Sequence, residues 1–294
     1  MGKLTGAARL FIGAAADDVI TVVADVTARN AIASPSDGDL AWVSGLGRMD
    51  KYVTSAWVDG NTDDEVGVVN TSYQENYDTI DLTDSTTAAG ASETGVTRQE
   101  INISYEGIMR DGSGNKLTGA NMSLVYNSIT IPIRTLTYET SFSEIDITDS
   151  GTAAGQKEFA ADRASRTTQF TGILRDDVAP LTNGAEQAAT LTLASGITVA
   201  GNLRIESAEE GSAINEAKTY TYSGSWQGAP TETALSPAGH LNSARKALLV
   251  YADGKTTLGS FYMLNRSING DVLADLRVSF DGKFTGAVTK TDAS

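Results

Sequence analysis

Residues 80–90 read IDLTDSTTAAG and residues 145–155 read IDITDSGTAAG, so that 9 of 11 positions are identical. The match continues without a gap to position 111 of the first copy, with 15 identities in 32 aligned positions at an offset of 65. Unrelated segments of this length share far fewer residues. A repeat of this kind indicates that one structural unit occurs twice in the chain.

Shorter repeated segments extend the repeat on both sides. Residues 3–7, KLTGA, recur at 116–120, and the change of offset leaves 48 extra residues in the first copy. Residues 222–229, YSGSWQGA, and 280–287, FDGKFTGA, share the pattern aromatic-x-Gly-x-aromatic-x-Gly-Ala. The chain therefore contains two leading halves followed by two trailing halves.

This order predicts a nested arrangement of two units. Residues 116–235 supply one complete unit. Residues 1–115, with a small β insertion at about 20–65, form the start of the other unit, which residues 236–294 complete. The alternative is four small strand modules with no such pairing.

The hydrophobic pattern is that of an all-β protein. In residues 101–107, INISYEG, apolar residues alternate with polar ones, which is the period of a half-buried strand. Gly is abundant, at 29 residues, and Pro is sparse, at 5. Turn signals at Asn183-Gly184, Asp253-Gly254 and Asn269-Gly270 separate the strand-like runs. We expect many strands joined by tight turns.

One short helix is expected between the two trailing halves. Ser236 is a suitable N-cap, and Pro237 suits the first helical position. The apolar residues up to Leu248, which include Leu241 and Ala244, recur on one helical face.

Charge and composition exclude several classes of function. There are 37 acidic and 22 basic residues, a formal net charge of −15, so the chain has no general attraction for nucleic acid. A surface that faces DNA would repel it. The absence of cysteine excludes disulfides and thiolate metal sites. Neither a signal-peptide core nor an apolar stretch of ~20 residues is present, so we expect cytoplasmic accumulation and no membrane partner.

Material for catalysis is sparse, and we expect neither an enzyme nor a cofactor. The single histidine, His240, is interpreted as a surface residue, and without cysteine few nucleophile–base pairs are available. A metal candidate is the alternating set Asp59, Asn61, Asp63 and Glu65, which is similar to the start of a calcium loop. Its sixth and twelfth positions do not fit such a loop, so we interpret it as a solvated acidic loop.

The repeated Thr83-Asp84-Ser85 and Thr148-Asp149-Ser150 could be mistaken for paired functional sites. We expect their side chains to bond nearby backbone and so to shape a loop. These loops could also contact a neighbouring molecule.

The unit at 116–235 resembles the tail tube proteins of long-tailed bacteriophages. The expected helix at 237–248, followed by Val250 to Lys255, also looks like the second half of that family, so the resemblance covers about two-thirds of the chain. It rests on an opening strand pair and on a few short motifs. They are Ile145 to Ser150, Ala154-Gly155, Glu158, Gly172 and Ser223-Gly224. That family folds as a β-sandwich with a helix and assembles into stacked rings around a DNA conduit. The resemblance implies two tail-tube-like β-sandwich or barrel units related by duplication.

The insertion has a resemblance of its own. Residues 27–43, TARNAIASPSDGDLAWV, with 51–52 and 56–58, are similar to a small β-motif of phage structural proteins, especially tail fibres and virion decorations. Trp42, Tyr52 and Trp57 would form its small core. An exposed aromatic pair, Trp42 and Trp57, could instead bind sugar.

The two resemblances imply a structural protein of the virion tail, assembled in the host cytoplasm. The chain would form rings that stack into a tube through which DNA passes, and tape-measure, tail terminator and baseplate proteins would be its partners. Because ordinary tube subunits form six-fold rings with one unit each, two units favour a trimer with pseudo-six-fold symmetry over a hexamer. The alternatives are a glycan-binding decoration or fibre protein, and a glycan hydrolase, which needs a cleft with paired carboxylates.

Overall fold

A computed structural model describes residues 9–12, 19–46, 48–58, 65–66, 68–81, 94–109, 115–149, 151, 157–173, 180–211, 218–233 and 244–291. This part of the chain is almost entirely β, as the sequence predicts, with one large sheet and one small sheet. The strands of the large sheet are β1 (Arg9–Ile12), β6 (Glu65–Val66), β7 (Val68–Asp81), β8 (Thr94–Ile108), β9 (Ser123–Tyr126), β10 (Ile129–Asp146), β11 (Phe159–Ile173), β12 (Glu186–Ala194), β13 (Ile197–Gly211), β14 (Thr219–Thr233), β15 (Arg245–Val250), β16 (Thr256–Asp271) and β17 (Arg277–Thr291).

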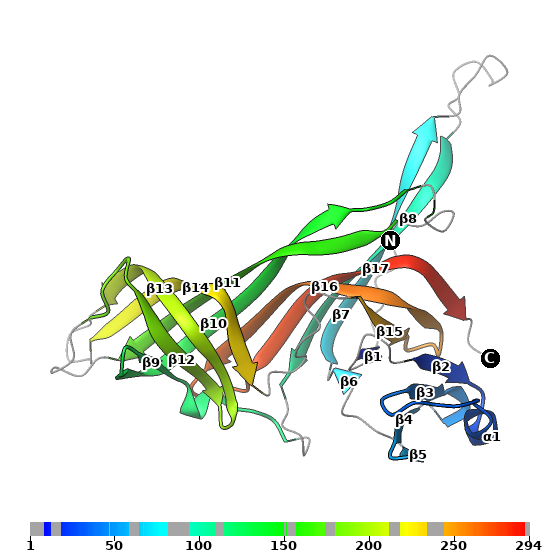
Figure 1. The fold of residues 1–294 in the computed structure, drawn as a ribbon, viewed down its shortest axis with the longest axis horizontal. Helices are drawn as coiled ribbons and strands as arrows, with labels where there is room; N and C mark the ends of the chain where they lie inside the picture. Colours follow the sequence, from blue (N-terminus) through cyan, green and yellow to red (C-terminus); the bar gives the residue numbers. More distant parts are fainter. Residues whose placement is uncertain are drawn as a thin grey trace.

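The small sheet contains β2 (Ile20–Val23), β3 (Leu40–Val43), β4 (Arg48–Val53) and β5 (Ala56–Val58). The described helical elements are the α-helix α1 (Val26–Asn30) and the 3-10 helices η1 (Ser44–Leu46) and η2 (Gly119–Asn121). Figure 1 shows the small sheet beside β1 and β15 at one end of the molecule, with the two halves of the large sheet extending away from it.

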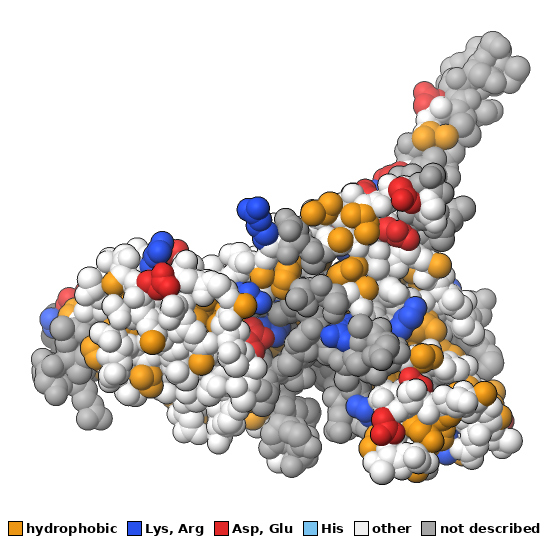
Figure 2. All heavy atoms as spheres, viewed as in Figure 1, with side chains coloured by type: hydrophobic (Ala, Val, Ile, Leu, Met, Phe, Trp, Pro, Cys, Tyr) orange, Lys and Arg blue, Asp and Glu red, His pale blue; other side chains and the backbone are white. Residues whose placement is uncertain are grey.

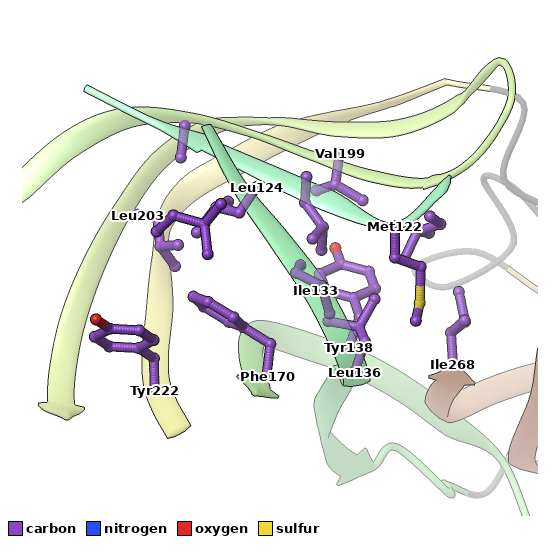
Figure 3. Packing of buried hydrophobic residues seen from close by; sticks show 14 of the residues in the cluster. Met122, Leu124, Ile133, Leu136, Tyr138, Phe170, Val199, Leu203, Tyr222 and Ile268 are labelled. Atoms are coloured by element: carbon purple, nitrogen blue, oxygen red, sulfur yellow. The ribbon is translucent and has the colours of Figure 1, made fainter. Parts of the chain in front are cut away.

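Six strands, β9 to β14, form what we call the second barrel. Their pairings run in the closed order β9, β10, β11, β14, β13, β12 and back to β9. Along β14 every second residue from Tyr220 to Trp226 is buried, because alternate side chains of a strand point to opposite faces. Figure 3 shows side chains such as Leu124, Tyr138 and Phe170 pointing toward one another in this core.

The remaining strands of the large sheet form what we call the first barrel. Its pairings run from β7 through β8, β17, β16 and β15 to β1. Strand β1 also pairs with the short β6, and β7 begins two residues after β6 ends. A separate apolar cluster that includes Leu10, Ile103, Phe261 and Phe280 fills this barrel.

The two barrels have the same strand order and register. Shifting by 65 residues converts the pair Ile80 and Gly95 of β7 and β8 into the pair Ile145 and Ala160 of β10 and β11. The register irregularities of both hairpins also coincide under this shift. A shift of 58 relates β15, β16 and β17 to β12, β13 and β14 in the same way.

The pairing between leading and trailing halves is also equivalent. Tyr105 of β8 lies opposite Phe280 of β17, and the corresponding residues Phe170 and Tyr222 lie opposite each other in β11 and β14. These rings contact each other in both places, at centroid distances of 4.5 Å and 5.1 Å. Strand β8 therefore pairs with the C-terminal strand β17, and β11 pairs with β14.

The barrels join along one strand edge, which we call the seam. Residues 135–141 of β10 pair with residues 265–271 of β16 in an antiparallel ladder. Strand β10 is long enough to do this because its first residues, 129–132, pair with β9 and leave the rest of that edge open. In Figure 1, β10 and β16 lie side by side between the two barrels.

The small sheet occupies the position of the predicted insertion. In the second barrel, β9 and β10 are joined by the two-residue turn Asn127-Ser128, whereas the small sheet lies between β1 and β6 of the first barrel. It packs on the large sheet through a shared apolar cluster that includes Phe11, Trp42 and Leu248. The insertion is therefore anchored to the first barrel.

The helix predicted from Ser236 to Leu248 is wrong over its described part. Residues 236–243 lie outside the described residues, and Arg245–Val250 form strand β15. Ala247 and Leu249 enter the core of the first barrel, while Leu248 and Val250 pack toward the small sheet. A strand that is buried on both faces needs a continuous apolar run, and such a run also fits one face of a helix.

Two turn predictions had different outcomes. Tyr251 to Lys255 form the tight connection between β15 and β16, with Gly254 at φ +84°. The turn predicted at Asn269-Gly270 is wrong, because both residues lie within β16. A Cβ at Gly270 would lie 2.4 Å from the sulfur of Met122, so this glycine allows close packing instead of a turn.

Candidate functional site

The barrels extend into two long hairpin arms, β7–β8 and β10–β11, and the first of these projects clearly from the body in Figure 1. Large apolar side chains are exposed along both arms, with between 46% and 50% of the surface of each accessible. They are Tyr77, Ile80, Ile145 and Ile147. Figure 2 shows apolar side chains gathered where the projecting arm leaves the body. Ile80 and Ile145 occupy equivalent positions of the two arms, and exposed apolar residues that gather in this way are typical of a contact surface.

Charged side chains link the two arms to each other. Lys283 of β17 lies 3.2 Å from Glu100 of β8 and 2.8 Å from Glu144 of β10. Lys157, just before β11, lies 3.0 Å from Asp78 of β7 and 3.7 Å from Glu100. Burial raises the pKa of Glu100, but hydrogen bonds from Asn102 and Lys283 outweigh this effect and lower it. Ion pairs therefore link the two arms.

The repeated Thr-Asp-Ser segment shapes a loop, as predicted, where it is described. The hydroxyl of Thr148 accepts a hydrogen bond from the backbone N–H of Glu158 at 2.9 Å. A carboxylate oxygen of Asp149 accepts from the backbone N–H of Gly151 at 2.7 Å. These contacts close the tip of the β10–β11 arm. Residues 83–85 of the first copy lie outside the described residues.

A buried charged cluster crosses the seam. Arg266 of β16 is 1% exposed, and its Nη2 lies 2.5 Å from Oε1 of Glu232 of β14. The hydroxyl of Tyr138 of β10 donates to the same carboxylate oxygen at 2.7 Å. Burial, together with the charge of Glu232, raises the pKa of Tyr138. Arg266 comes from the first barrel and the residues Glu232 and Tyr138 from the second, so the cluster links the barrels across the seam.

Sequence reasoning missed Arg266, although a signal was present. In β16 it lies on the inward face two residues before the fully buried Ile268, so it interrupts an apolar alternation. Its acidic partner is 34 residues away in the sequence and belongs to the other barrel. The pattern of β16 alone could not identify that partner.

The small sheet has a buried ion cluster of its own. Asp50 of β4 is fully buried and forms ion pairs with Arg29 of α1 and with Arg48, at 2.5 Å and 3.0 Å respectively. Asp25 caps α1 by accepting a hydrogen bond from the backbone N–H of Ala28. Together these contacts attach the helix to the sheet. Sequence reasoning gave no role to these residues.

The three predicted aromatic residues of the insertion lie in two places. Trp42 is 4% exposed and contacts Phe11 of β1, with ring centroids 5.5 Å apart. Tyr52 and Trp57 are half-buried and contact each other edge to face at 5.3 Å. The guanidinium of Arg29 lies over the Trp57 ring at 5.9 Å. Trp42 thus packs the insertion onto the first barrel, and Trp42 and Trp57 do not form an exposed pair.

Predicted ionic and catalytic candidates fall largely outside the described residues. The structure does not describe His240, Asp59, Asn61 or Asp63. Of Glu65 it describes only the backbone, as part of β6. Among the described residues, no group of three or more His, Asp or Glu side chains is placed to hold a metal ion. Likewise, no helix in the described ranges has the length and apolar character that crossing a bilayer requires.

A shallow polar hollow of about 270 Å³ lies on the outer face of the second barrel. Glu139 of β10 and Glu206 of β13 contribute carboxylates to it, and both side chains are exposed. A general acid at neutral pH needs a carboxyl group withdrawn from water, because desolvation keeps it protonated. Neither carboxyl group of the hollow is withdrawn from water in this way.

Similarity to known proteins is confined to solved structures. No family model matches the chain, and no curated protein matches it significantly. One solved structure, titled "Tail of empty GTA particle computed with helical refinement, C6 symmetry", is similar over 42% of this chain and 99% of that chain. The sequence identity is 16% and the TM-score is 0.31.

Proposed function

We propose that this protein is a structural component of a phage virion tail that self-assembles into stacked rings, which form the tube for DNA ejection. The observation that carries the proposal is the pair of barrels with the same strand order and register, joined edge to edge. A chain that already places two equivalent barrels side by side is suited to continue the same arrangement between subunits. The resemblance of residues 116–235 to tail tube proteins points the same way.

The proposal includes the nested duplication. The first unit would comprise residues 1–115 with the insertion, together with residues 236–294, and the second unit residues 116–235. The shared registers support this division, because β8 pairs with β17 and β11 with β14 in equivalent alignment. With two units in each chain, three chains would supply six barrels. We therefore favour a trimeric ring with pseudo-six-fold symmetry over a hexamer.

The charge of the chain suits a conduit. A formal net charge of −15 gives no general attraction for phosphates, so DNA would pass without being held. The partners would be further copies of the chain, a tape-measure protein inside the tube, and terminator and baseplate proteins at its ends. The protein would assemble in the host cytoplasm and reside in the virion tail.

Negative-stain microscopy and native mass spectrometry of the purified chain test the proposal. We expect rings or stacked rings, with a ring mass of three chains of 30.8 kDa each. A ring mass of six chains would contradict the trimer. Monomers at every concentration, with glycan binding that is lost in a Trp57→Ala variant, would favour the decoration or fibre role instead.

A further inference from the structure

The seam provides a template for contact between subunits. Within the chain, an edge of β10 at residues 135–141 pairs with an edge of β16 at residues 265–271. Strand β10 corresponds to β7 at an offset of 65, and β16 corresponds to β13 at an offset of 58. Within the described strands, the equivalent edges are therefore residues 72–76 of β7 and 207–211 of β13.

Both equivalent edges are open among the described strands. Residues 70–76 of β7 pair with β8 on one side only. Strand β13 pairs with β14 along its length, but its pairing with β12 ends at Arg204, which leaves 207–211 unpaired on that side. Unpaired strand edges recruit further strands, because their backbone N–H and C=O groups lack partners. One chain thus carries both halves of a second seam, one on each barrel.

The buried-side charge at the β7 edge is already balanced within the first barrel. At the seam, Glu232 of one barrel meets Arg266 of the other. At the equivalent positions the first barrel has Lys290 in place of Glu232 and Glu75 in place of Thr140, and these two form an ion pair at 2.5 Å. Burial raises the pKa of Glu75, but hydrogen bonds from Lys290, Tyr73 and Tyr77 outweigh this effect and lower it to about 2.

The incoming edge of β13 fits this arrangement. Its residue equivalent to Arg266 is Ala208, a small uncharged side chain that is half-buried in the single chain. Because Glu75 is neutralised within its own barrel, it needs no charge from the neighbour. The residue equivalent to Ile268 is Glu210, which would lie opposite Tyr73 and is paired with Lys218 of its own barrel at 3.0 Å. Tyr73, equivalent to Tyr138, is also half-buried and its ring contacts that of Tyr251. A neighbouring strand would cover both residues, as the seam covers Tyr138.

We propose that residues 72–76 of β7 in one subunit pair with residues 207–211 of β13 in the next copy of the same chain, in the register of the seam. The proposal rests on the proposed function, since it specifies the contact within a ring. The register places Asn76 opposite Ser207 and Ser72 opposite Gly211, as Ser141 lies opposite Asn265 and Thr137 opposite Asn269. Because the two edges differ, the contact is head-to-tail and closes into a ring when the rotation allows it.

Cysteine cross-linking tests the register, since the native chain contains no cysteine. In the full chain, Asn76→Cys combined with Ser207→Cys is expected to give covalent dimers and trimers on oxidation. The matched control combines Ser72→Cys with Ser207→Cys. It moves one thiol four residues along the edge, about 13 Å, and is expected to give no such product. All three side chains are exposed in the single chain, so folding is expected to survive.

Microscopy of the reduced variants separates the two proposals. Rings together with the 76–207 cross-link support the edge pairing. Rings without that cross-link, or with the control cross-link in its place, overturn the pairing and leave the proposed function intact. Absence of rings from the native chain overturns both.

A second measurement uses Ala208, which faces Glu75 in the proposed register. Ala208→Glu is expected to abolish rings by placing a carboxylate against Glu75, whereas Ala208→Ser is expected to retain them. Rings in the Glu variant contradict the pairing.

Discussion

At the scale of single residues, the repeated glycine pattern has a physical explanation. A Cβ at Gly224 would lie 2.7 Å from the carbonyl oxygen of Arg204, and one at the equivalent Gly282 would lie 2.1 Å from Cζ of Phe261. The second glycine of each copy, Gly228 or Gly286, has a positive φ of 70° or 66°. The first position therefore allows close approach between strands, and the second allows a local irregularity of the ladder.

Substitution of Gly228 isolates the backbone effect, because nothing lies within 4 Å of a Cβ built there. Gly228→Ala is expected to lower the free energy of unfolding by about 1–2 kcal/mol, the cost of a left-handed conformation for an L-residue. Gly228→Asn is expected to cost less, since asparagine tolerates this region. Urea unfolding followed by circular dichroism measures both. Equal losses in the two variants would contradict the explanation.

At the scale of elements, tight hairpins define the ends of the short strands. The β9–β10 turn places Asn127 and Ser128 at φ +47° and +67°, and the β4–β5 turn places Thr54 and Ser55 at +50° and +66°. Two-residue hairpins of this kind match the twist of the flanking strands but favour glycine, above all at the second position. The sequence uses serine there in both hairpins, so both turns carry backbone strain.

Ser128→Gly is expected to stabilise the protein by up to about 1 kcal/mol, because it removes the left-handed strain at the second turn position. Thermal unfolding should show the gain as a higher Tm. The matched control is Ser123→Gly in β9, where the residue is extended in the ladder and glycine is expected to destabilise. A lower Tm for the Ser128 variant would contradict the role given to the turn.

At the scale of the whole molecule, one buried ion pair adds to the strand ladder of the seam in joining the barrels. Arg266 cannot reach water, so its charge depends on Glu232 of the other barrel. The pair stabilises this junction, because breaking a buried pair leaves one charge uncompensated in a poorly solvated place.

Glu232→Gln is expected to lower the free energy of unfolding by about 3–5 kcal/mol, since it leaves the Arg266 charge without its acid. Adding Arg266→Met should recover most of that loss. The control, Glu186→Gln, removes one partner of an exposed pair with Arg204 at 3.7 Å and is expected to cost less than about 1 kcal/mol. Urea unfolding measures all three. A double variant as unstable as Glu232→Gln alone would contradict a role for charge.

The sequence alone determined the β class, the position of the insertion and the equivalence of the repeated segments. Period-two alternation and turn residues such as Asp253-Gly254 act over a few neighbours, so they can be read locally. The repeat at 80–90 and 145–155 directly located two equivalent hairpin arms, whose registers agree in the structure.

Only the tertiary structure decided the seam, the two-sided burial of β15 and the partner of Arg266. The apolar run of β15 suits a helix face as well as a strand between two cores, and only the packing of the small sheet distinguishes these. The seam pairs Thr140 with Arg266, 126 residues apart in the sequence. Hydrophobic periodicity states which face of a strand is buried, but the choice of edge partner depends on where the whole chain places other strands.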